Sequence, residues 1–248
     1  SWTRQLDGRS LGKLLVKWYA AHRPEGWDDD RYARLQADAQ RFADEGPDQP
    51  FLDVWFADAD HGYIVGAFNL VLATSDGGEH WMPWLDRSDN PKAYHLYAIR
   101  QVGGSIYAVG EQGLVLKLDA DAQRLRALAL PYGGTLFGIT GDDAGVIVYG
   151  LRGHAWRSTD HGASWQALDT HLDASLSAAT TFDHRIMLIG QTGQVLISSD
   201  GGATLAPAPV DVRVPASAVL SLGPDRLLIG GPLGLKTVRI GAGMQNTP

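Results

Sequence analysis

The chain has 248 residues, 44% of them hydrophobic, which is enough for a sizeable core within one domain. Its formal net charge of −7 argues against nucleic acid as the main partner. No stretch of about eighteen apolar residues occurs, so the sequence predicts no membrane-spanning helix. The absence of cysteine excludes disulfides and thiolate chemistry.

The N-terminal 48 residues divide into a short extended segment and a helical one. Residues 1–7 match residues 164–169, the end of a motif described below, so they predict a strand. Either this strand belongs to a repeat already under way, or it supplies the missing fourth strand of the last unit and closes the ring. Residues 8–48 place apolar side chains at helical spacing on either side of a Pro- and Gly-containing break. We expect a helical hairpin over residues 8–48, inserted between two repeats, with Asp28 as the N-cap of its second helix.

From residue 51 onward the sequence repeats. The motif [ST]-x-D-x-G-x-x-W occurs at residues 74–81 and 158–165, and a copy with Leu205 in place of tryptophan occurs at residues 198–205. Asp119 occupies the corresponding place in the gap between the first two copies. The aspartates recur at intervals of about 40 residues, which is typical of the four-stranded blades of a β-propeller.

A second motif has the same period. In each unit an apolar run leads into Gly-x-x-Gly or a relative of it, and a second apolar run follows, which predicts a hairpin. We therefore predict an all-β fold, a β-propeller of four-stranded blades with a helical insertion near the N-terminus. The chain is expected to form one domain with five blades over residues 51–90, 91–130, 131–172, 173–212 and 213–241, the last of them with three strands.

The repeated phrase is known as an Asp-box, and its residues predict a structural role. Glycine allows the positive φ of a hairpin turn, the aspartate accepts hydrogen bonds from backbone N–H groups, and the tryptophan packs over the turn. We assign this role to Asp76, Gly78, Trp81, Asp160, Gly162, Trp165, Asp200 and Gly202.

Asp-boxes also occur in sialidases, so a glycan-active or glycan-binding propeller is the alternative. A sialidase needs an arginine triad, a tyrosine–glutamate pair and an acid/base aspartate, and only Arg100 lies where a triad arginine is expected. A free-standing five-bladed, lectin-like module is a further alternative. The eight histidines show no metal-binding spacing, so we predict no catalytic residues, no metal and no cofactor.

Strand geometry indicates where a partner binds. Turns between the second and third strands share one face with the connections between blades, and the helical insertion is such a connection. Propellers bind partners across one face, where loops of several blades meet. The candidate partner-binding residues are Arg100, Gln112, Arg152 and Gln191, with Trp18 and Trp27 of the insertion.

Two segments closely resemble the blade consensus of the photosystem II assembly and stability factors. They are residues 56–66, FADADHGYIVG, and residues 72–81, LATSDGGEHW. The resemblance implies a seven-bladed, extracytoplasmic, non-enzymatic protein, of which this chain holds five blades without the signal peptide and the two N-terminal blades.

The same resemblance implies a partner. We expect a bacterial relative that acts as an assembly or accessory factor for a membrane-protein complex. A transporter subunit is one candidate client, since related proteins accompany exporters of the resistance-nodulation-division (RND) type.

Overall fold

The computed structural model describes residues 3–210, 212 and 214–241. These residues form two α-helices and five antiparallel sheets. The chain divides into two compact units. Unit 1 runs up to Ile99 and includes Leu116–Ala127, whereas unit 2 comprises Arg100–Val115 and the chain from Leu128 on. No helix in the described part of the chain is both long and apolar enough to cross a bilayer.

The hairpin consists of α1, Gly8–Ala21, and α2, Asp29–Glu45. Asp28 accepts a hydrogen bond from the backbone N–H of Arg31 at 2.7 Å, which confirms it as the N-cap of α2. The two helices pack closely at Gly12, where an added Cβ would lie 2.4 Å from the Cα of Ala43. Only glycine fits between helices that approach to this distance.

The predicted strand over residues 1–7 is wrong for residues 3–7, and Ser1 and Trp2 lie outside the described residues. Asp7 instead caps α1. Its side chain accepts hydrogen bonds from the backbone N–H groups of Arg9 and Ser10, and the Ser10 hydroxyl accepts the backbone N–H of Asp7. This capping box starts a helix at Gly8, so the chain leaves the extended path that the repeat alone predicts.

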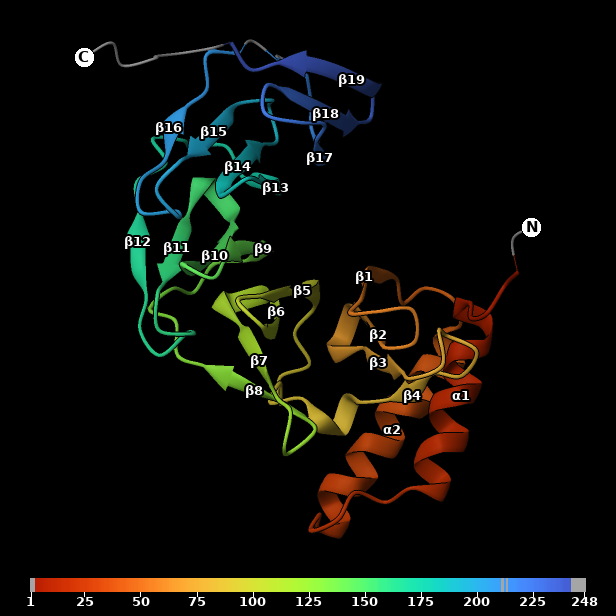
Figure 1. The fold of residues 1–248 in the computed structure, drawn as a ribbon. Helices are drawn as coiled ribbons and strands as arrows, with labels where there is room; N and C mark the ends of the chain where they lie inside the picture. The colour runs from red at the N-terminus through yellow and green to blue at the C-terminus, as the bar shows by residue number, and fades with distance from the viewer. Residues whose placement is uncertain (1–2, 211, 213, 242–248) are drawn as a thin grey trace. The chain divides into compact units, whose positions relative to one another are not determined.

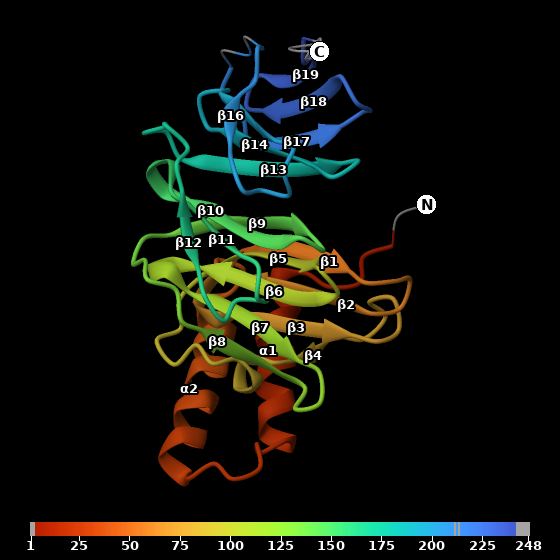
Figure 2. The same cartoon turned by 60° about the vertical axis from the view of Figure 1, so that its left-hand side comes forward.

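The first sheet of unit 1 has the order β1-β2-β3-β4. Its strands are β1 Phe51–Phe56, β2 Gly62–Gly66, β3 Val71–Thr74 and β4 Met82–Pro83. Figures 1 and 2 both show α1 and α2 side by side against this sheet. Leu11, Leu15 and Phe42 of the helices are buried in one hydrophobic cluster. The same cluster contains Leu70, which precedes β3, and Leu72 of β3.

The buried side chain of Tyr19 connects α1 to the segment that follows β4. The hydroxyl of Tyr19 donates to the Asp86 carboxylate at 2.8 Å and accepts the backbone N–H of Leu85 at 3.0 Å. Burial, reinforced by the Asp86 charge, raises the pKa of Tyr19, so the hydroxyl keeps its proton and its donor role.

The other sheets follow the same meander. The second has the order β5-β6-β7-β8, with β5 Leu96–Val102, β6 Ser105–Gly110, β7 Val115–Asp119 and β8 Arg124–Leu128. The third consists of β9 Leu136–Asp142, β10 Gly145–Gly150, β11 Ala155–Ser158 and β12 Gln166–Leu168. The fourth consists of β13 Leu176–Phe182, β14 Arg185–Gly190, β15 Val195–Ser198 and β16 Ala206–Pro207. The fifth has three strands, β17 Ala218–Ser221, β18 Arg226–Gly231 and β19 Gly234–Arg239.

Within unit 2 the first strands of successive sheets, β9, β13 and β17, lie next to one another. Strand β14 shows how the sheets between them share their cores. Ile186 and Leu188 pack in a cluster with residues of β10, whereas Met187 and Ile189 pack in a cluster with residues of β18. Because successive side chains point to opposite faces of a strand, an unbroken apolar run is what burial on both faces requires.

Each Asp-box turn is organised around a buried hydroxyl. In the second box, Ser158 donates to the carboxylate of Asp160 at 2.8 Å and accepts the backbone N–H of Gly162 at 2.8 Å. The same carboxylate accepts both the backbone N–H and the hydroxyl of Ser164. Trp165 packs on this turn, with Cζ2 3.4 Å from the position of a Cβ on Gly162.

The other two boxes repeat this network. Thr74 and Ser198 take the place of Ser158, and His80 and Thr204 take the place of Ser164. These bonds lower the pKa of each aspartate to about 2. The largest cause is the backbone N–H of His80 for Asp76, and the hydroxyls of Ser164 and Thr204 for Asp160 and Asp200.

Replacement of the buried hydroxyl tests the box. Ser158→Ala leaves the buried N–H of Gly162 without an acceptor, and we expect it to lower the free energy of unfolding by about 1–3 kcal/mol. The neighbouring exposed Thr159→Ala is the control, which we expect to change stability little. Urea denaturation followed by circular dichroism measures both, and equal effects of the two variants would contradict the assignment.

Removal of the Tyr19 hydroxyl tests how the hairpin is anchored. Tyr19→Phe keeps the ring in the core but leaves the buried N–H of Leu85 unpaired, so we expect a loss of about 1–3 kcal/mol in stability. Lys17→Gln, an exposed change on the same helix, serves as the control. If hydrogen exchange of α1 were the same in Tyr19→Phe and the parent protein, the hydroxyl would not hold the helix in place.

The lowered pKa values of the Asp-box aspartates predict that acid destabilises the fold. A lowered pKa in the folded state stabilises the fold above the ordinary value of 3.8, and this contribution is lost as the pH falls from 3.8 towards 2. We expect carboxyl-carbon NMR to show Asp160 titrating near pH 2. Ser164→Ala removes the largest cause and should raise that pKa, while Asp200 stays unchanged. An Asp160 titration near 3.8 in the parent protein would refute the network.

Candidate functional site

The turns between second and third strands are anchored on both sides, so they present side chains from a fixed backbone. In unit 2, Leu151 donates its backbone N–H to Thr135, which precedes β9, and the carbonyl of Gly153 accepts the hydroxyl of Thr170 in the following connection. The turn after β14 is held in the same way, through Gln191, Ser175 and Ala216. We call these turns and the connections bonded to them the turn edge. In unit 1 the corresponding turn, Ala67–Asn69, is bonded to Pro50 and Tyr94.

Three of these turns hold a non-glycine residue in the left-handed region. Phe68, Gln112 and Arg152 have φ values of 53°, 54° and 54°. This conformation is unfavourable for residues with a Cβ. All three side chains are exposed. Unit 2 therefore presents Gln112 and Arg152 to solvent at a cost in backbone energy. Strained residues of this kind cluster at binding and catalytic sites, which makes both side chains candidates for contact with a partner.

Gln191 lies in the next turn along unit 2 and lines a cavity of about 400 Å³. Its other walls are Phe137, Ser177, Ala216, Ser217 and two prolines, Pro215 and Pro232. Arg100 differs from the other candidates of unit 2, because it lies within strand β5 and is half-buried. The turn edge therefore includes Gln112, Arg152 and Gln191 and leaves out Arg100.

Trp18 and Trp27 line one cavity of about 780 Å³ in unit 1. The ring of Trp18 stacks on His22 with centroids 4.0 Å apart, and the guanidinium of Arg31 lies 3.7 Å from the ring centroid of Trp27. Both tryptophans also pack against the core of unit 1, so part of each ring serves the fold. Sequence reasoning missed His22 and Arg31, although both lie within one helical turn of a predicted tryptophan.

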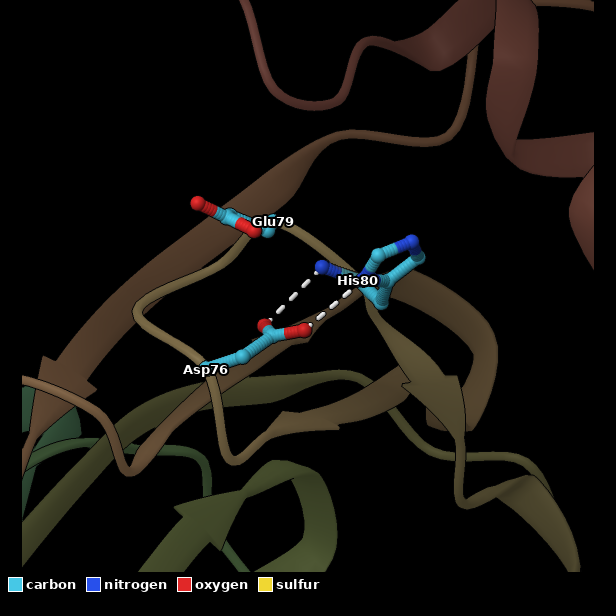
Figure 3. Close-up of side chains that lie close together, drawn as sticks. All are labelled: Asp76, Glu79 and His80. Carbon is cyan, nitrogen blue, oxygen red and sulfur yellow. Dashed lines mark hydrogen bonds and ion pairs between the residues drawn. The ribbon is translucent and has the colours of Figure 1, made fainter.

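Figure 3 shows a group of possible metal ligands, Asp76, Glu79 and His80. Of the described residues, these alone bring three His, Asp or Glu ligand atoms within 4.8 Å of one another. The Asp76 carboxylate already accepts the backbone N–H of His80 at 2.9 Å and contacts its ring Nδ1 at 2.8 Å. All three side chains are solvent-accessible. The hydrogen bonds of the Asp-box turn are enough to explain why these three side chains lie close together.

The chain is similar in sequence to a protein of known role. It is 32% identical over 124 residues to the photosystem II assembly lipoprotein Ycf48 of Synechococcus sp. (strain CC9902). The match covers 47% of this chain and 36% of the relative, so it spans about a third of that protein's length.

Two solved structures show a similar fold. The structure of YCF48 bound to D1 peptide matches with a TM-score of 0.56 and 18% identity, covering 75% of this chain and 64% of that one. The WD40 β-propeller domain of Doa1 matches with a TM-score of 0.62 and 13% identity, covering 79% and 67%. These likenesses confirm the β-propeller fold class.

The family model described as photosynthesis system II assembly factor YCF48 matches residues 43–171. The matched segment includes the first sheet, the second sheet and the third sheet through β12. It also contains two of the three Asp-boxes, with Asp76 and Asp160. The match extends over more than half of the chain, and the protein therefore belongs to the family of photosynthesis system II assembly factor YCF48.

Proposed function

We propose that the protein binds a segment of a membrane-protein complex, without catalysing a reaction, and assists the assembly of that complex. The observation that carries this proposal is membership of the YCF48 family together with a solved YCF48 bound to D1 peptide. An extracytoplasmic location is part of the proposal, and the word lipoprotein in the name of the Synechococcus relative supports it.

The turn edge of unit 2 is the surface that we assign to the client. Gln112, Arg152 and Gln191 are exposed there on turns held by backbone hydrogen bonds. The Gln191 cavity, with its phenylalanine and two prolines, offers apolar surface beside polar groups. A peptide needs this combination, because apolar contacts give affinity and a few polar groups fix its orientation.

Photosystem II is the client that the comparisons favour, through the D1 peptide of the related structure. An RND exporter subunit is the second client to be tested, and it has no support from the comparisons. The glycan-active alternative also has no support from them. Affinity purification from solubilised membranes, followed by mass spectrometry, distinguishes the two membrane clients.

Glycine substitutions at left-handed turn residues allow an effect on client binding to be separated from an effect on stability. Arg152→Gly removes the side chain but relieves the backbone, so we expect the free energy of unfolding to rise by about 0.5–1 kcal/mol while client recovery falls. His161→Gly is the matched control, since His161 has φ 58° and lies in the box turn at the other end of β11. It should gain similar stability and keep its client.

The proposed function fails if no membrane-complex subunit is enriched over a mock purification. The assignment of the turn edge fails if Arg152→Gly and Gln112→Gly recover as much client as His161→Gly does. Adding both glycine substitutions together should reduce recovery further, because the two side chains lie on successive turns.

A further inference from the structure

Unit 1 contains a cavity of about 530 Å³ beneath one face of α2, a size typical of ligand sites. Arg31, Arg34, Leu35 and Asp38 line it and lie at the spacing of one helix face. The opposite walls come from the turn after β2, the connection after β4, and β8. These walls include Phe68, Asn69, Leu85, Ser88, Asp89 and Arg124.

Within the described ranges, some of the charged side chains that line this cavity have an ion-pair partner, and others have none. Arg124 binds the carboxylate of Asp89 at 2.9 Å, and Asp38 pairs with Arg41 at 3.3 Å. Both acidic groups of the lining thus have a cationic partner. Arg31 and Arg34 have no carboxylate partner among the residues that the structure describes. A chain with a net charge of −7 therefore presents two uncompensated guanidinium groups in one cavity.

The cavity also has an aromatic wall. The guanidinium of Arg31 lies over Trp27, which fixes its orientation before any ligand arrives. Phe68 is 38% exposed, although it occupies a left-handed turn position with φ 53°. With Leu35 and Leu85, these rings give an entering group apolar contact as well as charge.

Two buried polar groups of the lining lack a partner. Asn69 and Ser88 are 8% and 7% exposed, and within the described part of the chain neither the Asn69 Oδ1 nor the Ser88 Oγ has a hydrogen-bond partner. The amide nitrogen of Asn69 already donates to the carbonyl of Leu85, so the group left without a partner is its oxygen, an acceptor. Such orphaned groups are costly, and a ligand that bonds to them recovers that cost.

Together these observations narrow the ligand class. Inorganic phosphate satisfies the arginines but makes no use of the apolar wall of Leu35, Phe68 and Leu85. An extended acidic peptide supplies a carboxylate for Arg31 and Arg34, an N–H for Asn69 and a carbonyl for the Ser88 hydroxyl. We propose that this cavity is a binding site for a short acidic peptide segment, separate from the turn edge of unit 2.

The test uses the whole chain and a defined probe. Fluorescence anisotropy of labelled acetyl-Ala-Glu-Ala-Asp-Ala should show saturable binding that weakens as salt is added. The neutral peptide acetyl-Ala-Gln-Ala-Asn-Ala should bind at least tenfold more weakly. Glutarate, added as a competitor, separates a peptide site from a site for any small dicarboxylate, and we expect it to compete poorly.

Two substitutions locate the site. Arg34→Gln should weaken the acidic peptide about tenfold, whereas Arg9→Gln, an exposed arginine of α1 outside the cavity, should not. Ser88→Ala should weaken binding while leaving stability unchanged or higher, because its hydroxyl has no partner to lose. A purely structural role for Ser88 predicts the opposite change in stability.

The proposal is overturned if the acidic and neutral peptides bind alike, if glutarate competes as well as the peptide, or if Arg34→Gln binds like the parent protein. An absence of peptide binding up to millimolar concentration also overturns it. None of these outcomes bears on client recovery through the turn edge, which is measured with different variants.

Discussion

Three of the five sheets of this protein depend on a buried hydroxyl at the end of the third strand. Ser158 shows the principle, since its oxygen joins a backbone N–H of the turn to a carboxylate that closes the same turn. The group is 2% exposed, so water cannot replace either bond. Because the turn fixes where the fourth strand begins, it also sets the register in which β12 pairs with β11.

The sequence predicts the sheets well because their signals are local. A glycine, an aspartate and a hydroxyl within five residues specify each box turn, whatever lies elsewhere in the chain. Residues 3–7 show the limit of this reasoning. Their likeness to a repeat predicts a strand, but a capping box between Asp7 and Ser10 starts a helix there. Two local signals competed, and only the structure shows which one prevailed.

The candidate sites were less predictable, for a physical reason. Gln112, Arg152 and Gln191 follow from strand alternation and turn position, which the repeat makes visible. The α2 cavity does not, because it brings Arg34 together with Asn69 and Ser88, which are distant in sequence. No periodicity marks a polar group whose partner is missing. Such a group becomes evident only when its surroundings are known.

The left-handed turn residues have a consequence for how this propeller diversifies. At Gln112 and Arg152 the turn is held by backbone hydrogen bonds, and the side chain is exposed. A change of side chain at one turn thus leaves the neighbouring blades unaltered. Duplicated blades can therefore acquire different recognition residues one at a time, and each residue other than glycine adds a similar backbone cost at its turn.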